Sequence, residues 1–186
     1  MKKILLLLVF LSAVHLIGQA QSGIVPPPVP VKGSSHAASL HLHLPVGVFA
    51  RSHVAGAGIN YAWSRNRFGR SVPVAGLIGF TANAGADYYL GKKITTAGYD
   101  FTYGGYTNLY VQAGALINPL PTAYFSLTAG PAMDLYEGNT TVGLGVNLYG
   151  AYYLTSNIAV GPGLLYKKDA QTDALWTATI RVSYIF

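Results

Sequence analysis

From residue 39 to residue 186, apolar and polar residues alternate in short runs. We count eight such runs, at 39–49, 54–63, 78–90, 106–117, 124–136, 142–154, 158–166 and 174–186. In the last run, Ile180, Val182, Tyr184 and Phe186 fall on one face while Arg181 falls on the other. A period of two residues is that of a β-strand. The pattern therefore predicts eight strands, each with one apolar and one polar face.

The polar faces of these runs carry very few charges. They consist mainly of Gly, Asn, Gln, Ser, Thr and Tyr, whereas a surface in contact with water normally carries many Lys and Glu side chains. The whole chain has 10% charged and 51% hydrophobic residues and a mean hydropathy of +0.35, against about 25% charged residues in a typical soluble domain. We therefore expect the polar faces to line an interior and the apolar faces to contact lipid.

The sequence after residue 20 contains no apolar stretch long enough for a transmembrane helix. A chain of this kind can satisfy its backbone in lipid only as a closed β-barrel. The predicted fold class is thus all-β, an eight-stranded antiparallel up-and-down transmembrane β-barrel. Glycines within the strands fit a narrow lumen filled with side chains, and the Gly-x-Gly stretches predict close packing because no helical pattern follows them.

The N-terminal segment predicts export. Two lysines, an apolar run and the small residues Gly18 and Ala20 indicate a secretory signal peptide at 1–20. Residues 21–38 are rich in Pro, Gly and Ser and predict an extended lead-in, with a peptide ligand for a partner as the alternative, and the barrel spans 39–186. The chain has no cysteine, so it has neither a disulfide nor an acceptor for a lipid anchor.

Aromatic residues gather near the strand ends, as in the two interfacial girdles of membrane barrels. One expected girdle consists of Tyr61, Trp63, Tyr124, Phe125, Tyr152, Tyr153, Tyr184 and Phe186, and the other of Tyr88, Tyr106, Tyr136, Tyr166 and Trp176.

These features resemble a known family, the small bacterial outer-membrane β-barrel proteins of the eight-stranded type that consist of the barrel only. The resemblance rests on the signal peptide, the repeated strands, and the ending in Phe186 with Tyr184, Val182 and Ile180 at alternate positions, and it covers about four-fifths of the chain. In that family such an ending is read by the barrel-assembly machinery. The resemblance implies a monomer in the bacterial outer membrane, in contact with lipid and lipopolysaccharide.

An even strand count places both termini in the periplasm. The links 118–122 and 155–157 are then predicted periplasmic turns, and 91–105, 137–140 and 167–173 are short external loops. The link Ser64–Ser71, which the strand count also places in the periplasm, fits this topology least well, because it is longer than a turn needs and carries three arginines.

Catalytic and metal-binding arrangements find little support. Asp134, Glu137 and His53 are expected near outer strand ends, but the sequence has no activated nucleophile and no Gly-x-Ser-x-Gly elbow, so we expect no enzymatic activity. His41 and His43 share a face and with His36 could bind a metal; hydrogen-bonded lumen histidines are the favoured interpretation, and we predict no metal or cofactor site. The net charge of +6, about +4 without Lys2 and Lys3, is too small and scattered to indicate nucleic acid.

The alternation points three charged side chains into the lumen, namely Asp87, Asp134 and Arg181. Buried charges are costly unless they are paired. We therefore expect Arg181 to meet at least one of the two aspartates. Neighbouring polar side chains should help, and the candidates are Asn83, Gln112, Asn147 and Tyr110. Such a network would act either as a plug against ions or as internal packing.

The sequence favours a structural or surface-interaction role over a porin for large solutes, because eight strands enclose too little lumen. A narrow channel, a small-ligand-binding membrane barrel and an outer-membrane lipid-modifying enzyme remain as alternatives. A soluble ligand-carrying barrel would need the apolar faces inside, leaving only Gly, Asn and Thr to keep it in solution.

Overall fold

The structure, a computed structural model, describes residues 34–66, 77–96, 99–120, 122–169 and 174–186. The predicted signal peptide, most of the lead-in and part of the Ser64–Ser71 link lie outside these residues. Eight strands form the barrel: β1 (Ser35–Val46), β2 (His53–Asn66), β3 (Leu77–Gly91), β6 (Tyr106–Leu120), β7 (Ala123–Tyr136), β8 (Asn139–Tyr153), β9 (Ile158–Asp169) and β10 (Leu175–Ile185).

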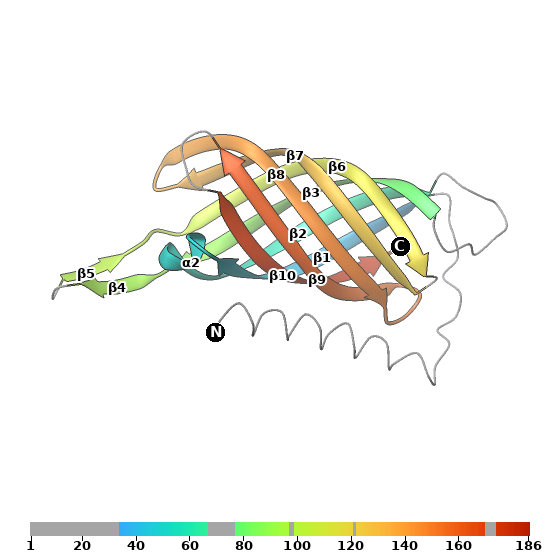
Figure 1. Cartoon of the computed structure of the whole chain (residues 1–186), viewed down its shortest axis with the longest axis horizontal. Coiled ribbons are helices and arrows are strands. Elements are labelled where there is room, and N and C mark those ends of the chain that lie inside the picture. Colours follow the sequence, from blue (N-terminus) through green and yellow to red (C-terminus); the bar gives the residue numbers. More distant parts are fainter. Residues whose placement is uncertain (1–33, 67–76, 97–98, 121, 170–173) are drawn as a thin grey trace.

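Each of the eight strands pairs antiparallel with its neighbours, and the pairing of β1 with β10 closes the barrel (Figure 1). The seam between β1 and β10 continues one residue beyond the end of β10, because the backbones of His36 and Phe186 exchange two hydrogen bonds of 3.2 and 2.9 Å. The predicted fold class, an all-β, eight-stranded, antiparallel up-and-down barrel, is confirmed.

Strand boundaries differ in detail from the prediction. β1 begins at Ser35, four residues earlier than the predicted run, because Ala37 and Ala38 already pair with Ile185 and Tyr184 of β10. β2 continues through Ser64 to Asn66, where it pairs with Gly79 of β3. Within the described residues, β2 and β3 pair directly, and the barrel has the predicted eight strands.

The two faces of each strand lie as the alternation predicts. Outward-facing apolar side chains are exposed, among them Leu40, Leu42, Ile59, Val111, Val142 and Ile180, each 59–68% exposed. Inward-facing polar side chains are buried, as His41, Asn83, Asp87, Gln112 and Thr128 illustrate. The molecule thus has the apolar exterior and polar interior expected of a barrel in lipid.

Only part of the two predicted aromatic girdles faces outward. Tyr61, Tyr88, Phe125, Trp176, Tyr184 and Phe186 are exposed, but Tyr106 and Tyr124 are buried in the lumen. Adjacent residues of a strand point to opposite faces, so Phe125 faces outward and Tyr124 inward although both lie at the same strand end.

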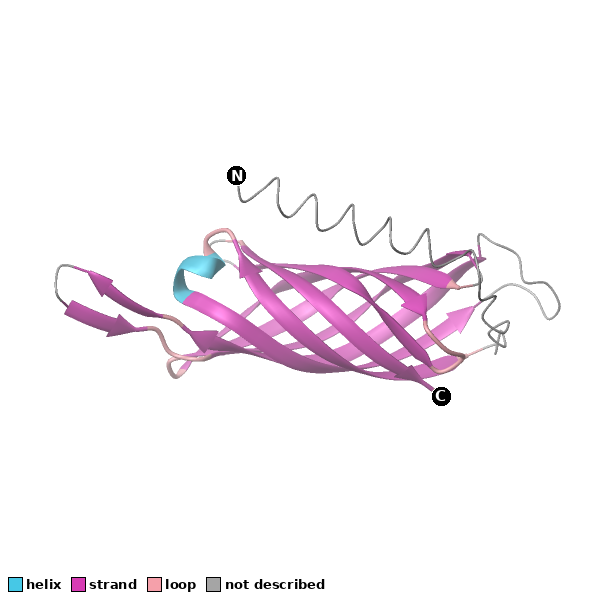
Figure 2. Ribbon diagram, turned by 90° about the horizontal axis from the view of Figure 1, so that it is seen from below, coloured by secondary structure: helices cyan, strands magenta, loops and turns pink. Residues whose placement is uncertain are grey.

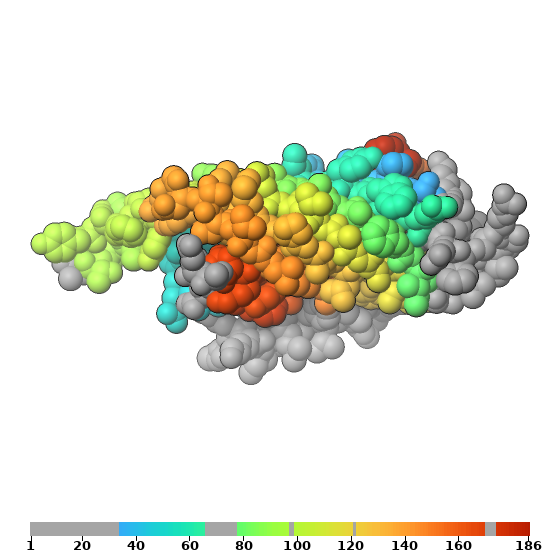
Figure 3. Space-filling model, turned by 90° about the horizontal axis from the view of Figure 1, so that it is seen from above, coloured from blue at the N-terminus to red at the C-terminus, as the bar shows by residue number. Residues whose placement is uncertain are grey.

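The two ends of the barrel are built differently. At one end, short turns join β6 to β7 and β8 to β9. The start of β1 and the end of β10 lie at this same end (Figure 1). The opposite end carries the short helix α2 (Phe49–Ser52) and a projecting hairpin of β4 (Lys93–Thr96) and β5 (Tyr99–Thr102), where the sequence predicted only a loop (Figures 1 and 2). In space-filling view the hairpin is a narrow extension of the wider barrel (Figure 3). Among the described residues, none forms a helix long and apolar enough to span a membrane.

Candidate functional site in the lumen

An aromatic layer closes the lumen at the hairpin end. Phe49 of α2 points into the barrel, and its ring centroid lies 5.0 Å from that of Tyr89, 5.3 Å from that of Tyr106 and 4.5 Å from that of His53. All four side chains are at most 8% exposed. Because α2 turns the chain inward after β1, an apolar side chain caps the polar interior.

A row of paired residues runs from strand to neighbouring strand around part of the barrel wall, next to the aromatic layer. Arg181 of β10 pairs with His41 of β1, His41 with Gly58 of β2, and Gly58 with Asp87 of β3. The row continues from Asp87 to Asn108 of β6 and from Asn108 to Asp134 of β7. We call these six residues the charged row.

Within the charged row, Asp87 is bound by histidines. His43 Nε2 lies 3.0 Å from Asp87 Oδ1, and His41 Nδ1 lies 3.7 Å from the same oxygen. Asn108 donates a hydrogen bond of 3.5 Å to Asp87 Oδ2. Gly58 has no side chain to separate His41 from Asp87: a Cβ at this position would lie 2.0 Å from Asp87 Oδ1.

The second aspartate of the row, Asp134, forms an ion pair with Lys167 of β9. Lys167 also donates a hydrogen bond of 3.2 Å to the hydroxyl of Tyr106, and its ammonium group lies 5.8 Å from the centre of that ring. Both charged side chains are at most 3% exposed. The Lys167 side chain therefore links the charged row to the aromatic layer.

Neutral polar side chains fill the middle of the lumen. Asn83 donates to Thr128 Oγ1 at 3.2 Å, and Thr128 donates to Gln112 Oε1 at 3.0 Å. Asn60 donates to the hydroxyl of Tyr110 at 3.4 Å. These contacts join side chains of β2, β3, β6 and β7, which are four consecutive strands of the barrel wall.

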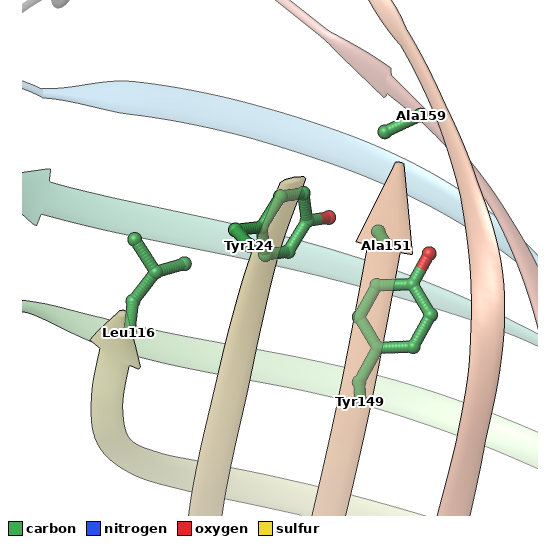
Figure 4. Close-up of a cluster of buried hydrophobic side chains, with 5 residues drawn as sticks. All are labelled: Leu116, Tyr124, Tyr149, Ala151 and Ala159. Carbon is green, nitrogen blue, oxygen red and sulfur yellow. The ribbon is translucent and has the colours of Figure 1, made fainter. Parts of the chain in front are cut away.

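A second aromatic cluster fills the end near the short turns. It consists of Leu116, Tyr124, Tyr149, Ala151 and Ala159, with Tyr153 packed against it (Figure 4). The Tyr124 and Tyr149 rings lie 5.8 Å apart. Arg181 stacks on Tyr149, with its guanidinium carbon 4.2 Å from the ring centre.

The predicted pairing of Arg181 with an aspartate is wrong. Neither Asp87 nor Asp134 lies within ion-pair distance of Arg181; the structure pairs Asp87 with the two histidines and Asp134 with Lys167. The register explains the difference, because His41 and Gly58 separate Arg181 from Asp87 in the charged row. Of the predicted helpers, Asn83, Gln112 and Tyr110 join lumen hydrogen bonds. Asn147 is buried, and its side-chain oxygen has no hydrogen-bond partner among the residues that the structure describes.

Sequence reasoning missed Lys167 and Asp169, which it assigned to an external loop. Both residues belong to β9 and are at most 5% exposed. The inward positions Ala159, Gly161 and Gly163 continue through Leu165 to Lys167 and Asp169, so the same alternation marks them. Three consecutive charged residues, Lys167–Asp169, are more typical of an exposed loop, and for this reason residue type alone predicts a loop here.

Of the residues considered for catalysis and metal binding, His41 and His43 lie together, whereas Asp134, Glu137, His53 and His36 lie apart from them with partners of their own. Asp134 is engaged by Lys167, Glu137 accepts a hydrogen bond from the backbone of Gly104, and His53 contacts the hydroxyl of Ser52. His36 lies on the outer side, 2.6 Å from the hydroxyl of Tyr61, and is not part of the cluster of His41 and His43.

No family model and no curated protein matches the sequence. The fold, however, is shared with solved outer-membrane barrels. Ail of Yersinia pestis, in complex with the heparin analogue sucrose octasulfate, is 12% identical over 82% of this chain and 97% of its own, with a TM-score of 0.55. Ail in a phospholipid bilayer nanodisc is 12% identical over 83% and 100%, with a TM-score of 0.54. The outer membrane enzyme PagL is 10% identical over 80% and 98%, with a TM-score of 0.53. The chain thus has the fold of small eight-stranded outer-membrane barrels.

Proposed function

We propose that this chain is an integral protein of the bacterial outer membrane whose sealed lumen makes it a structural or surface-interaction protein rather than a porin. The observation that carries the proposal is the filled interior. Two aromatic clusters close its ends, and buried polar side chains, several of them hydrogen-bonded to one another, occupy the space between them. A barrel of eight strands is narrow enough for side chains to fill it.

The proposed orientation has both termini in the periplasm. Support comes from the short β6–β7 and β8–β9 turns, because outer-membrane barrels carry short turns on the periplasmic side and longer connections outside. The hairpin of β4 and β5 then faces the cell exterior. The exposed apolar side chains on the outside of the barrel would contact lipid and the acyl chains of lipopolysaccharide. We also propose that the protein is a monomer, since the closed barrel leaves no free strand edge in its wall.

Ion conductance tests the sealed lumen. The purified barrel, recognised by a different gel mobility before and after boiling, is inserted into planar lipid bilayers. We expect no stepwise conductance, with a known porin as the positive control. Steady single-channel steps from the wild-type barrel would support a narrow channel and contradict the proposal. Recovery from cells as a soluble periplasmic protein would contradict the membrane location.

We propose that the projecting hairpin of β4 and β5 makes the surface interaction. Tyr99 is 81% exposed and Phe101 is 52% exposed, and Lys92 and Lys93 are exposed close by. Ail, which has this fold, was solved with a sulfated heparin analogue. Exposed lysines beside aromatic rings provide charge and stacking surface for a sulfated glycan.

A hairpin replacement tests this assignment. Residues 93–102 are replaced by Asn-Gly, and cells displaying equal amounts of heat-modifiable barrel are compared for retention on immobilised heparin. We expect the wild type to be retained and the shortened barrel to be lost. Equal retention of both would place the interaction elsewhere, and no retention of either would leave the structural role alone.

A non-enzymatic role is part of the proposal. Its support is that the acidic side chains at the hairpin end already have partners, Asp134 with Lys167 and Glu137 with the Gly104 backbone. Ester hydrolysis by the purified barrel, lost on substitution of Ser52 by Ala, would contradict it, because Ser52 is the hydroxyl in contact with a histidine at this end.

Recognition by the barrel-assembly machinery is proposed for Phe186, with Tyr184, Val182 and Ile180. Phe186 stacks on His36, with ring centroids 5.9 Å apart, and lies at the β1–β10 seam. Phe186→Asp should reduce insertion in cells while purified protein still refolds in detergent. Equal losses in both settings would mean that Phe186 only stabilises the seam.

A further inference from the structure

We propose that His41, His43 and Asp87 form a binding site for a divalent transition metal, with Zn²⁺ as the best match, inside the lumen. One ring nitrogen of His41, one ring nitrogen of His43 and an Asp87 carboxylate oxygen all lie within 4.8 Å of one another. The three side chains are at most 4% exposed. This site is independent of the proposed surface role.

The donor set matches zinc chemistry. Two imidazole nitrogens and one carboxylate oxygen, with a fourth position for water, are ligands that Zn²⁺ takes in tetrahedral geometry at about 2.0–2.1 Å. Ligand atoms around such an ion are about 3.3 Å apart. The separations of 3.0 Å and 3.7 Å from Asp87 Oδ1 to the two histidines bracket that value. The ligand nitrogens of the two histidines lie within 4.8 Å of each other, so metal binding would draw the two rings together.

The electrostatics of the site call for a cation. Asp87 is a carboxylate 1% exposed, and within the described residues its ion-pair partners are only the two histidines, which carry charge only when protonated. A buried carboxylate without a positive partner is strongly unfavourable. Arg181, which pairs with His41 across the seam, opposes the binding of a dication, so the affinity depends on the three ligands together.

The surroundings hold the ligands in place. Asn108 donates to Asp87 Oδ2 and leaves Oδ1 directed at the histidines, in the manner of outer-shell groups that orient metal ligands. The ring of His43 packs on Tyr89 with centroids 5.3 Å apart. Gly58 leaves the space in which Asp87 approaches His41. Phe49 and Tyr89 cover the site from the hairpin end, so metal is best supplied while the barrel folds.

The experiment refolds the full barrel in detergent with excess Zn²⁺, removes loose metal with a chelator, and measures zinc per folded protein. The variants are His41→Gln, His43→Gln and Asp87→Asn, and the matched control is His36→Gln, since His36 lies outside the cluster. We expect about one Zn²⁺ per barrel in the wild type and the control, and at least tenfold less in each of the three variants, since a His/Asp site loses most of its affinity with any one ligand.

Two outcomes would overturn the site: no chelator-resistant zinc in the wild type, or zinc retained by all three variants. Loss of zinc in His36→Gln as well would also overturn it, because that result indicates adventitious binding by exposed histidines. If a variant does not regain its unboiled gel mobility, a second measurement on the wild type tests the site instead. This measurement is the visible spectrum of Co²⁺ refolded into the wild-type barrel. An intense tetrahedral spectrum supports the site, and the weak spectrum of octahedral Co²⁺ overturns it.

Discussion

Removing the ammonium group of Lys167 should destabilise the barrel strongly. In Lys167→Met, Asp134 loses its ion-pair partner, and Asp169, which interacts electrostatically with Lys167, loses a nearby cation. Methionine keeps much of the length of the lysine stem, so the change removes mainly charge and hydrogen bonding. The Tyr106 hydroxyl loses its bond from Lys167 at the same time.

The size of the effect follows from burial. Unit charges about 4 Å apart interact by about 4 kcal/mol at an effective dielectric constant of about 20. Breaking a buried pair by removing one partner typically costs about 3–5 kcal/mol. Both partners here are at most 3% exposed, so solvent screening does not reduce this cost. The expected loss is thus a large part of a typical stability of about 5–15 kcal/mol.

Urea unfolding of the barrel refolded in detergent measures this loss, followed by tryptophan fluorescence and gel mobility. With a denaturant slope of about 2 kcal/mol per molar, the midpoint should fall by about 1.5–2.5 M. Lys168→Met is the matched control, because Lys168 is the adjacent residue of β9 and is exposed. It should shift the midpoint far less.

The double variant Lys167→Met with Asp134→Leu decides the mechanism. Since the second change removes the stranded carboxylate, the double variant should recover about 0.5–3 kcal/mol relative to the sum of the two single variants. Strict additivity, or an unchanged midpoint in Lys167→Met, would refute the reasoning that the pair is a buried electrostatic unit.

Three further perturbations are informative. Arg181→Ala should lower the free energy of unfolding by about 2 kcal/mol through loss of the desolvated stacking on Tyr149, with no conductance in planar bilayers; conductance from a folded variant would instead show a plug. Gly58→Ala should cost about 1–3 kcal/mol in urea unfolding, because the new Cβ would lie 2.0 Å from Asp87 Oδ1 and 2.8 Å from the Ala86 carbonyl, and wild-type stability would show that the wall can yield. In the hairpin, a hydrogen bond from Lys93 holds the pKa of Asp100 below its ordinary value of 3.8. The stabilisation of β4–β5 by Asp100 is therefore present above about pH 4 and is lost as the pH falls through the lowered pKa. The protection factors of the hairpin amides, which are the ratios of the intrinsic to the observed exchange rate at each pH, should fall there in the wild type and not in Asp100→Asn.

The alternation of apolar and polar residues predicts which side chains face lipid and which face the lumen, because this prediction needs only local information. A residue's parity along one strand decides whether it meets lipid or lumen, so Leu42 and Asp87 were assigned correctly from the sequence. The same rule extends through Lys167, which was lost because its charged neighbours suggested a loop. At Lys167 and Asp169 the position along the strand determines burial, whereas the residue type does not.

Partners across the lumen depend on information that no single strand contains. Whether Arg181 meets Asp87 is decided by the stagger of β10, β1, β2 and β3, which the barrel fixes as a whole. The inward turn of Phe49 depends on a four-residue helix too short to give a periodic pattern. The histidines were expected to bond to lumen neighbours, but the partner they share, Asp87, lies 44 residues from His43.

The tight turn between β7 and β8 has a consequence for the order of assembly. Glu137 and Gly138, with φ of 48° and 81°, form a two-residue turn that joins Tyr136 to Asn139, whereas the seam brings together Ser39 and Ser183, 144 residues apart. Closing the longer loop costs about 4 kcal/mol more in chain entropy. We expect β7–β8 to pair early and the seam last, so that a cysteine pair at 39 and 183, in a chain that has no cysteine of its own, would crosslink only after the interior has filled. Whatever the lumen holds is then enclosed by the final step of folding, and its later exchange requires the seam to open.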